Sequence, residues 1–316
     1  MYTLNNFFRC PNCQNKLANK NDKVICPECK KSYSSSCEIP DFRTLFKEGE
    51  WDSQIFEKIY LEVDAEYEDA DIHAKRCRIP EFIEKYRRTE KDSPIYEFIK
   101  KQKPQKLLDL GCGYGWYTFT LAKYLPNTIF FGADISEKRI KAYSKKIKQK
   151  KIGTFIPVLA NAEKLPFPNN LFDIIVMREV LEHVADPEKT LKEINKKLAP
   201  RGTLIITTPT KKMRIFWYVA TFFPRIIKNI FAKTEKKESI YDVPLSKRKL
   251  KKLFNNASLN ISSWHYCVLL PHESLLQFFP EWVLKIFILF SPIMHFLKIN
   301  KIFALHHLIF LDKKKN

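Results

Sequence analysis

The central part of the chain alternates short apolar runs with polar, amphipathic stretches. Runs of this length, separated by stretches long enough for a helix, are typical of buried parallel strands joined by helical crossovers. Two further apolar runs near the end of the sequence predict two more strands. The runs cover residues 107–110, 128–134, 171–177 and 203–208, followed by 261–270 and 303–311.

The first of these runs ends in a glycine-dense turn. The chain has 7 glycines, and Gly111, Gly113 and Gly115 follow directly after Leu-Leu-Asp-Leu. Glycine lets the backbone approach a ligand closely, and the N–H groups of a following helix point at that ligand. The order strand, Gly-x-Gly-x-Gly, helix therefore predicts a nucleotide-binding α/β sheet. An ordinary α/β domain with a glycine turn is the alternative interpretation.

An acid stands at the end of the next predicted strand. Asp134 closes the run 128–134, and an acid roughly 20 residues after the glycines suits a carboxylate that holds ribose hydroxyls. Taken together, residues 107–118 and Asp134 resemble the class I S-adenosylmethionine (SAM) dependent methyltransferases, whose first motif is similar to Leu-Asp-Leu-Gly-Cys-Gly-x-Gly. Residues 160–168 look like the loop that holds the adenine ring, and 198–209 like the fifth strand with its preceding turn.

The resemblance covers about residues 92–270. It implies a Rossmann-like α/β fold with a seven-stranded sheet. Asn161 departs from it, because the family usually has Asp there, although an amide can both donate to and accept from an adenine edge. The cofactor-binding residues that the resemblance implies are Asp109, Gly111, Cys112, Gly113, Gly115, Asp134, Ile135, Asn161, Ala162, Glu163 and Arg178.

Two Cys-x-x-Cys pairs stand near the beginning of the chain. Cys10 and Cys13 form the first pair, and Cys26 and Cys29 form the second. Four thiolates in this spacing predict a tetrahedral structural zinc site, and a redox-active Cys-x-x-Cys is the rival interpretation. Residues 6–43 resemble the Trm112-like zinc ribbon, although Cys37 and Glu38 depart from its pattern and put the geometry of that loop in question.

The stretch between the ribbon and the methyltransferase-like region is polar and rich in acids. We expect domains at 1–43 (zinc ribbon), 44–91 (helical connector or lid) and 92–316 (methyltransferase domain). Tyr60 and Tyr67 are candidate lid residues. A solvated linker is the alternative interpretation of this stretch.

Candidate catalytic residues follow the run 171–177. Glu179, Glu182 and His183 are spaced i, i+3 and i+4, so on a helix they would share one face. Their pattern resembles that of ubiquinone-pathway O-methyltransferases, in which such residues bind a divalent cation that orients a hydroxyl group. A plain general base or substrate contact, and a purely structural role, remain open alternatives.

The C-terminal third carries apolar segments at 210–240 and 271–300. The uncharged part of the second segment is too short to span a bilayer, which needs about 20 residues. Aromatic side chains with flanking lysines suit a helical hairpin at a membrane interface. Core, dimer interface or substrate lid are the alternatives, and the sequence carries no signal for the oligomeric state.

The net charge of +20 favours an acidic partner, either nucleic acid or an anionic membrane surface. A coding bias towards lysine is the simpler explanation. No signal peptide is visible at the start of the sequence, so we expect a cytoplasmic protein, peripheral on the inner face of the membrane. In that reducing compartment the 8 cysteines would be thiols or metal ligands.

Three functions remain. The first is SAM-dependent methylation, at oxygen, of a small or lipid-linked apolar acceptor at the membrane surface. The second is methylation of a ribosomal or transfer RNA base, with the zinc ribbon and lysines on the phosphates; the sequence Met-Arg-Glu-Val lacks the Asn/Asp-Pro-Pro-Tyr/Phe motif of many base-amine methylating enzymes. The third is a non-catalytic scaffold, which the intact Asp109, three glycines and Asp134 argue against.

Overall fold

The computed structural model describes most of the regions that carry these motifs. The described residues are 7–20, 23–36, 39–43, 81–149, 153–210, 245–267, 280–296, 304 and 306–314. Several predictions fall outside them: the connector up to residue 80 with Tyr60 and Tyr67, the loop at Cys37 and Glu38, and the apolar segment at 211–240.

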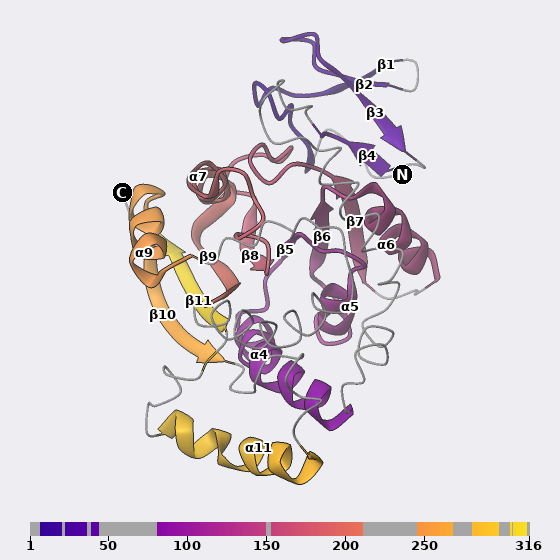
Figure 1. Ribbon diagram of the computed structural model, residues 1–316. Helices are drawn as coiled ribbons and strands as arrows, with labels where there is room; N and C mark the ends of the chain where they lie inside the picture. The colour runs from indigo at the N-terminus through magenta and orange to yellow at the C-terminus, as the bar shows by residue number, and fades with distance from the viewer. Residues whose placement is uncertain are drawn as a thin grey trace, which may run out of the picture.

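The apolar runs form strands, as predicted, in one mixed α/β sheet (Figure 1). Parallel pairing joins β7, β6, β5, β8 and β9, and the two last strands add antiparallel pairs in the order β9-β11-β10. These strands are β5 (Lys106–Leu110), β6 (Ile129–Asp134), β7 (Thr154–Leu159), β8 (Phe172–Arg178), β9 (Leu198–Pro209), β10 (Leu259–Cys267) and β11 (His306–Lys313).

The sheet of the described residues has eleven strands where we expected seven. The N-terminal segment contributes β1 (Ala18–Lys20), β2 (Lys23–Ile25), β3 (Ser32–Ser36) and β4 (Ile39–Asp41). β4 lies parallel to β7 through the pair Asp41 and Leu159, and the N–H of Phe42 donates to the carbonyl of Leu159 over 2.8 Å. The N-terminal module therefore covers the edge of β7, which would otherwise expose unpaired backbone groups.

Helices cover both faces of the sheet. One face packs on α4 (Glu81–Gln102), α5 (Trp116–Ala122) and α6 (Glu137–Gln149); the other packs on α7 (Pro187–Lys197) and α9 (Lys247–Asn256). Successive residues of β5 alternate between the faces, since Leu107 joins the first core and Leu108 the second. We expected a domain boundary between residues 91 and 92, and helix α4 continues across that position. The division of the chain into domains remains a prediction.

Aromatic rings attach the N-terminal module to the face of the sheet that carries α7 and α9. Phe8 packs between Phe42 and Phe167, with ring centroids 5.2 and 5.7 Å away. The buried ammonium of Lys197 donates to Gln14 of the module over 2.6 Å and pairs with Glu193 at 3.2 Å. A buried polar group needs such partners, because leaving one without a hydrogen bond costs about 1–3 kcal/mol.

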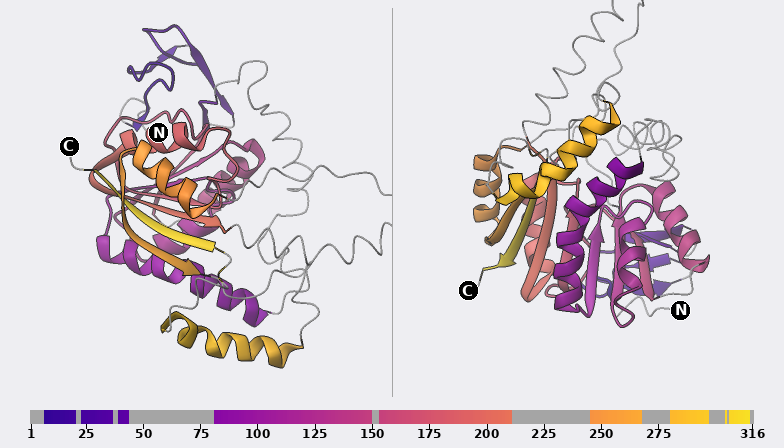
Figure 2. Two further views of the ribbon diagram at one scale, coloured as in Figure 1. Left: turned by 60° about the vertical axis from the view of Figure 1, so that its left-hand side comes forward. Right: turned by 90° about the horizontal axis from the view of Figure 1, so that it is seen from below.

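Helix α11 (Glu281–Phe296) lies next to the first turns of α4, at the bottom of the molecule in Figure 1 and in the left view of Figure 2. Only residues 103–105 join the end of α4 to the beginning of β5. The helix therefore runs antiparallel to β5, and its first turns lie near the carboxyl ends of the parallel strands. The ammonium of Lys285 lies 5.3 Å from the ring of Phe82 in the first turn of α4. Among the described residues, no helix combines the length and apolar character that a bilayer span requires.

Candidate functional site

The glycine turn after β5 forms the centre of the site. Gly111 and Gly115 have φ angles of 76° and 72°, in the left-handed region that other residues avoid. A side chain at Gly111 would also collide with Val180, and one at Gly115 would collide with the ring of Tyr143. Both glycines are therefore required by backbone angle and by space.

The acid at the end of β6 holds this turn in place. The Asp134 carboxylate accepts hydrogen bonds from the N–H groups of Gly113 and Ser136, each over 2.9 Å. Asn161, just past the end of the neighbouring strand β7, closes a small turn by accepting from the N–H of Glu163 over 2.9 Å. Asp134 and Asn161 thus stand on neighbouring strands at the same carboxyl edge, where ligands bind in parallel sheets.

A hollow of about 200 Å³ opens at this edge. Nine of its sixteen lining residues come from the sequence prediction, and Arg139 and Val180 are among those that the prediction missed. The lining residues that belong to the predicted cofactor and catalytic sets are Gly111, Asp134, Ile135, Asn161, Ala162, Glu163, Arg178, Glu179 and His183. Leu110, Ala133 and Ala160 also line the hollow.

A second hollow, of about 260 Å³, lies on the other side of the glycine turn. It shares Gly111, Arg178 and Glu179 with the first hollow, so the two are neighbours across one wall. Its remaining lining combines one acid, one cation and three aromatic rings. They are Asp109, Lys146, Tyr114, Trp116 and Tyr117, with Cys112.

Asp109 is a buried carboxyl group in this second hollow, and its Oδ2 atom has no hydrogen-bond partner among the described residues. Burial raises its pKa to about 7, although the neighbouring Arg178 guanidinium works in the opposite direction. A buried acid with this environment is suited to receive a cationic group of a ligand.

Arg178 is held by aromatic rings. Its guanidinium carbon lies 4.4 Å from the centroid of the Tyr117 ring, which stacks on Tyr96 of α4 at 4.8 Å. A cation over an aromatic face is stabilised by the quadrupole of the ring. The positive charge of Arg178, at the end of β8, is therefore held beside Asp109 by rings from α5 and α4.

The helix that we predicted through Glu179, Glu182 and His183 does not exist. Residues 179–185 form an irregular turn that begins with Glu179 at a left-handed φ of 52°. The helix starts later, at Pro187, because the Asp186 side chain caps it by accepting from two backbone N–H groups.

The three residues consequently separate. Glu179 and His183 line the first hollow, whereas the Glu182 carboxylate is buried and accepts from the hydroxyl of Thr208 over 3.0 Å. Among the described residues, the only group of side chains arranged to hold a metal ion is the cysteine cluster, so the expected second cation has no geometric support. The roles of Glu179 and His183 remain predictions.

His306 is a neighbour of the site that sequence reasoning missed. It begins β11, it is buried, and its Nε2 lies 3.2 Å from Oε2 of Glu179. The sequence contains no local signal for this contact, because β11 reaches Glu179 only through its pairing with β9.

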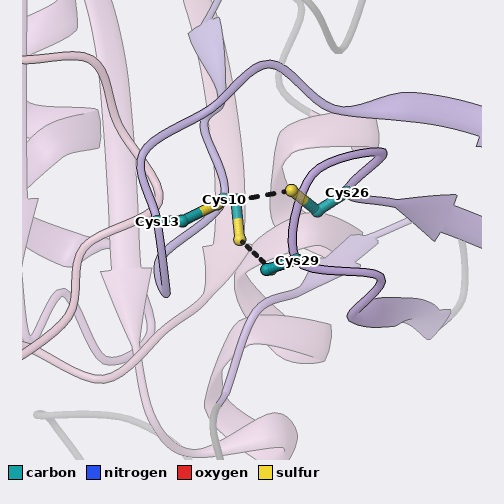
Figure 3. A group of neighbouring side chains, drawn as sticks. All are labelled: Cys10, Cys13, Cys26 and Cys29. Carbon is teal, nitrogen blue, oxygen red and sulfur yellow. Dashed lines mark hydrogen bonds between the residues drawn. The ribbon is translucent and has the colours of Figure 1, made fainter.

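The four predicted cysteines converge between two facing loops (Figure 3). Their Sγ atoms all lie within 4.8 Å of one another, with Cys10 to Cys29 at 3.5 Å and Cys13 to Cys26 at 3.4 Å. A tetrahedral zinc ion with Zn–S bonds of about 2.3 Å would separate its sulfurs by about 3.8 Å. The cluster therefore fits a zinc ion closely.

The thiols of this cluster differ in their protonation. A hydrogen bond from the backbone N–H of Lys31 lowers the pKa of Cys29 to about 6, whereas burial raises that of Cys26 to about 12. A metal ion bound by all four sulfurs must displace the proton of Cys26, so metal affinity should fall as the pH falls.

A comparison with known protein families matches residues 108–206 to a methyltransferase domain. Over 167 residues the chain is 33% identical to the demethylmenaquinone methyltransferase of Staphylococcus saprophyticus, covering 49% of this chain and 70% of that enzyme. It is 32% identical over 134 residues to the Geobacillus stearothermophilus enzyme of the same name, covering 42% of this chain and 57% of that one.

A third relative is the ubiquinone/menaquinone biosynthesis C-methyltransferase of Pasteurella multocida, 33% identical over 107 residues, with 33% of this chain and 40% of that enzyme covered. Among solved structures, a complex between the Haloferax volcanii Trm112 methyltransferase activator and a methyltransferase aligns with a TM-score of 0.48 and 16% identity. That alignment covers 78% of this chain and 96% of the other.

Proposed function

Since this chain belongs to the class I SAM-dependent methyltransferases, in the family of the menaquinone and ubiquinone methyltransferases, we propose that it methylates a lipid-linked apolar acceptor at a membrane surface. The observation that carries the cofactor part of the proposal is the pair of hollows on either side of Gly111. Each hollow offers the chemistry of one end of SAM.

The first hollow suits the nucleoside. The Asp134 carboxylate keeps lone pairs for the ribose hydroxyls, because Oδ2 accepts one backbone hydrogen bond, from Gly113, and Oδ1 accepts one, from Ser136. Asn161 presents an amide on the neighbouring strand, one position further from the glycine turn.

The second hollow suits the amino-acid end, which carries an ammonium and a carboxylate. Asp109 offers a buried negative charge for the ammonium. Arg178 and Lys146 offer positive charges for the carboxylate. A zwitterion is thereby matched by opposite charges at both of its groups.

Cofactor affinity should consequently depend on pH through Asp109. In the unliganded enzyme the pKa of Asp109 is about 7. Below that pH, protons therefore compete with the cofactor ammonium for the Asp109 carboxylate. The affinity should therefore rise with pH and level off above 7. We expect the dissociation constant of S-adenosylhomocysteine at pH 6 to be about tenfold larger than at pH 8, measured by titration calorimetry.

The matched control for this pH dependence is Asp109→Asn, which keeps the size of the side chain and cannot titrate. Its affinity should be weaker and nearly constant between pH 6 and 8. An equally steep slope in the variant would show that Asp109 does not receive the ammonium.

Glu179 is the residue that we assign as the base. It lies on the wall shared by both hollows, and the Nε2 atom of His306 lies 3.2 Å from its Oε2. SAM supplies an electrophilic methyl group on a positively charged sulfur. Glu179 would take the proton of an acceptor hydroxyl, and the oxygen would then form the new C–O bond as the bond between the methyl carbon and the sulfur breaks and S-adenosylhomocysteine leaves. The family relative from Pasteurella multocida is named a C-methyltransferase, so an assay must distinguish oxygen from carbon.

Helix α11 supports the proposed membrane contact. Trp282, Leu289 and Phe290 are 65%, 72% and 50% exposed, and Ile286 and Ile293 are also exposed on the same helix. Their spacing of three to four residues places most of them on one face. An exposed apolar face with an interfacial tryptophan, on a chain of net charge +20, suits an anionic membrane surface at the inner face of the membrane.

For the cysteine cluster we propose a structural zinc ion. All four sulfurs would be ligands, which leaves no open position for a substrate, so the metal would stabilise the N-terminal module and take no part in methyl transfer.

A partition experiment tests the function. The purified protein is incubated with SAM labelled in its methyl group and a lysate of its source organism, and the label is counted in the lipid, RNA and protein fractions. Label in the lipid fraction is expected, and nuclear magnetic resonance of that product distinguishes a methoxyl group from a methyl group on carbon. Label in RNA would overturn the proposal.

A matched pair of variants tests the membrane contact in the same assay. Trp282→Ser combined with Leu289→Ser should preserve binding of S-adenosylhomocysteine and lower the label in lipid at least about fivefold. Tyr124→Ser removes an aromatic ring that is 59% exposed elsewhere on the surface, and it should change neither quantity. Equal losses in both variants would argue against a specific role for α11.

A further inference from the structure

We propose that the outer edge of β10 binds an extended, acidic segment of a partner protein by strand addition. Among the described residues β10 ends the sheet on one side, and α9 packs against it (Figure 1). In strand addition, backbone hydrogen bonds give the affinity and nearby side chains select the segment that is added. The inference does not depend on the cofactor site.

The two ends of the sheet differ in how they resist pairing with another chain. At the far end the outermost strand, β1, has three residues and includes Lys20. A short edge strand and an edge lysine both discourage pairing. β10 has nine residues and contains no proline, lysine, arginine, aspartate or glutamate. After a bulge between Ile261 and Ser263 its pairing with β11 is regular up to Cys267.

The outer edge of β10 is accessible in the part of the chain that the structure describes. No further strand pairs with β10 there. Asn260, Ser262 and His265 are exposed, and Ile261 is 38% exposed. On the other side of the sheet, β4 covers the edge of β7. β10 is therefore the long strand that the described elements leave open to pairing.

Helix α9 places a row of cations beside this edge. The Lys247 ammonium donates to the Tyr266 hydroxyl over 3.2 Å and lies 5.0 Å from the centroid of the Trp264 ring, so contacts with β10 hold it in place. Lys251 is exposed and follows one helical turn later on the same side of α9. Five of the first six residues of α9 are lysine or arginine. A strand added beside β10 would run along these charges, which favours carboxylate side chains.

The same charges disfavour two other occupants. Antiparallel pairing of β10 with β10 of a second copy would relate the copies by a two-fold axis perpendicular to the sheet. The two α9 helices would then lie on the same face, with their lysine rows near each other, and like charges would oppose the contact. The phosphates of RNA would engage the lysines and leave the backbone groups of the strand edge unpaired.

A designed peptide tests the proposal on the full chain. The probe is a fluorescein-labelled peptide of about ten residues that alternates glutamate with valine, and its binding is followed by fluorescence anisotropy. One control peptide has lysine in place of every glutamate. The other keeps the glutamates and carries a methyl group on every backbone nitrogen, which removes the donors that strand pairing requires. Each control should bind at least about tenfold more weakly than the probe.

Two substitutions on the same helix locate the binding site. Lys251→Glu reverses a charge on the β10 side of α9 and should weaken binding of the acidic probe about fivefold. Lys249→Glu is the matched control. Lys249 lies two turns before Asn256, whose amide donates to Glu188 of α7 over 2.9 Å, so Lys249 faces away from β10. Its substitution should change the affinity less than about twofold, and thermal unfolding verifies that both variants fold.

Hydrogen exchange of the complex supplies a readout that does not rely on substitution. Saturation with the acidic probe should add protection to the backbone amides of residues 259–267. Equal binding of the three peptides, equal effects of the two substitutions, or added protection confined to other residues would overturn the proposal. Failure of the probe to bind at millimolar concentration would also overturn it. A natural protein that sediments as a dimer with these amides already protected would assign the edge to a second copy instead.

Discussion

Replacing Asp134 by alanine should reduce the affinity for S-adenosylhomocysteine at least about 100-fold. The variant loses the proposed charged hydrogen bonds to two ribose hydroxyls, each worth about 1.5–3 kcal/mol. It also loses the hydrogen bonds that the carboxylate accepts from Gly113 and Ser136, which hold the glycine turn against the end of β6. Calorimetric titration of the natural protein and the variant at pH 8 measures the difference.

Asp173, near the amino end of β8, offers a matched control on the side of the sheet away from the site. Asp173 also accepts from two backbone N–H groups, those of Gln105 and Lys106, over 2.8 and 2.9 Å. Asp173→Ala should therefore lower the thermal stability by a comparable amount and leave the affinity for the cofactor within about threefold. Near-normal binding by Asp134→Ala, or a comparable loss of binding in both variants, would remove Asp134 from the proposed ribose site.

Replacing Cys26 and Cys29 together by serine should abolish zinc binding and unfold the N-terminal module. A structural zinc ion contributes about 10–16 kcal/mol in small zinc-binding peptides at neutral pH. The module is too small to fold on its apolar residues alone. Metal analysis should give about one zinc per chain in the natural protein and none in the variant, and hydrogen exchange should show lost protection across residues 7–43.

Loss of the module should also reduce the yield of soluble protein, because β4 covers the edge of β7 and Phe8 and Phe42 bury apolar surface of the core. The folded fraction should still bind the cofactor, since none of the module's described residues lines either hollow. Cys267→Ala is the control, because Cys267 is a buried cysteine outside the cluster. Unchanged zinc content in the double variant would disprove the four-sulfur site.

Part of the candidate site could be predicted because its signals are local. Gly111 and Gly115 stand where a left-handed backbone is needed, and an acid at the end of the next strand follows from the spacing of parallel strands. The predicted helix through Glu179, Glu182 and His183 was wrong, because a spacing that suits one helical face is equally compatible with a turn. The helix-capping signal in Asp186-Pro187 was present in the sequence and places the start of α7 correctly.

Contacts between distant segments could not be predicted in this way. The approach of His306 to Glu179 depends on the pairing of β11 with β9, and the stack of Arg178 on Tyr117 depends on the packing of α4 and α5. The orientation of the Asn161 amide depends on the turn that engages its oxygen.

The sequence by itself determined the class of fold, the glycine turn with its acid, and the cysteine cluster, because each arises from hydrophobic periodicity, backbone angle or the spacing of ligands along the chain. The tertiary structure decided that the sheet extends through β4, that two hollows meet at Gly111, and that Glu179 and Glu182 point to different partners. These features depend on which strands pair and on which side chains compete for the same buried space, and such choices involve residues far apart in the chain.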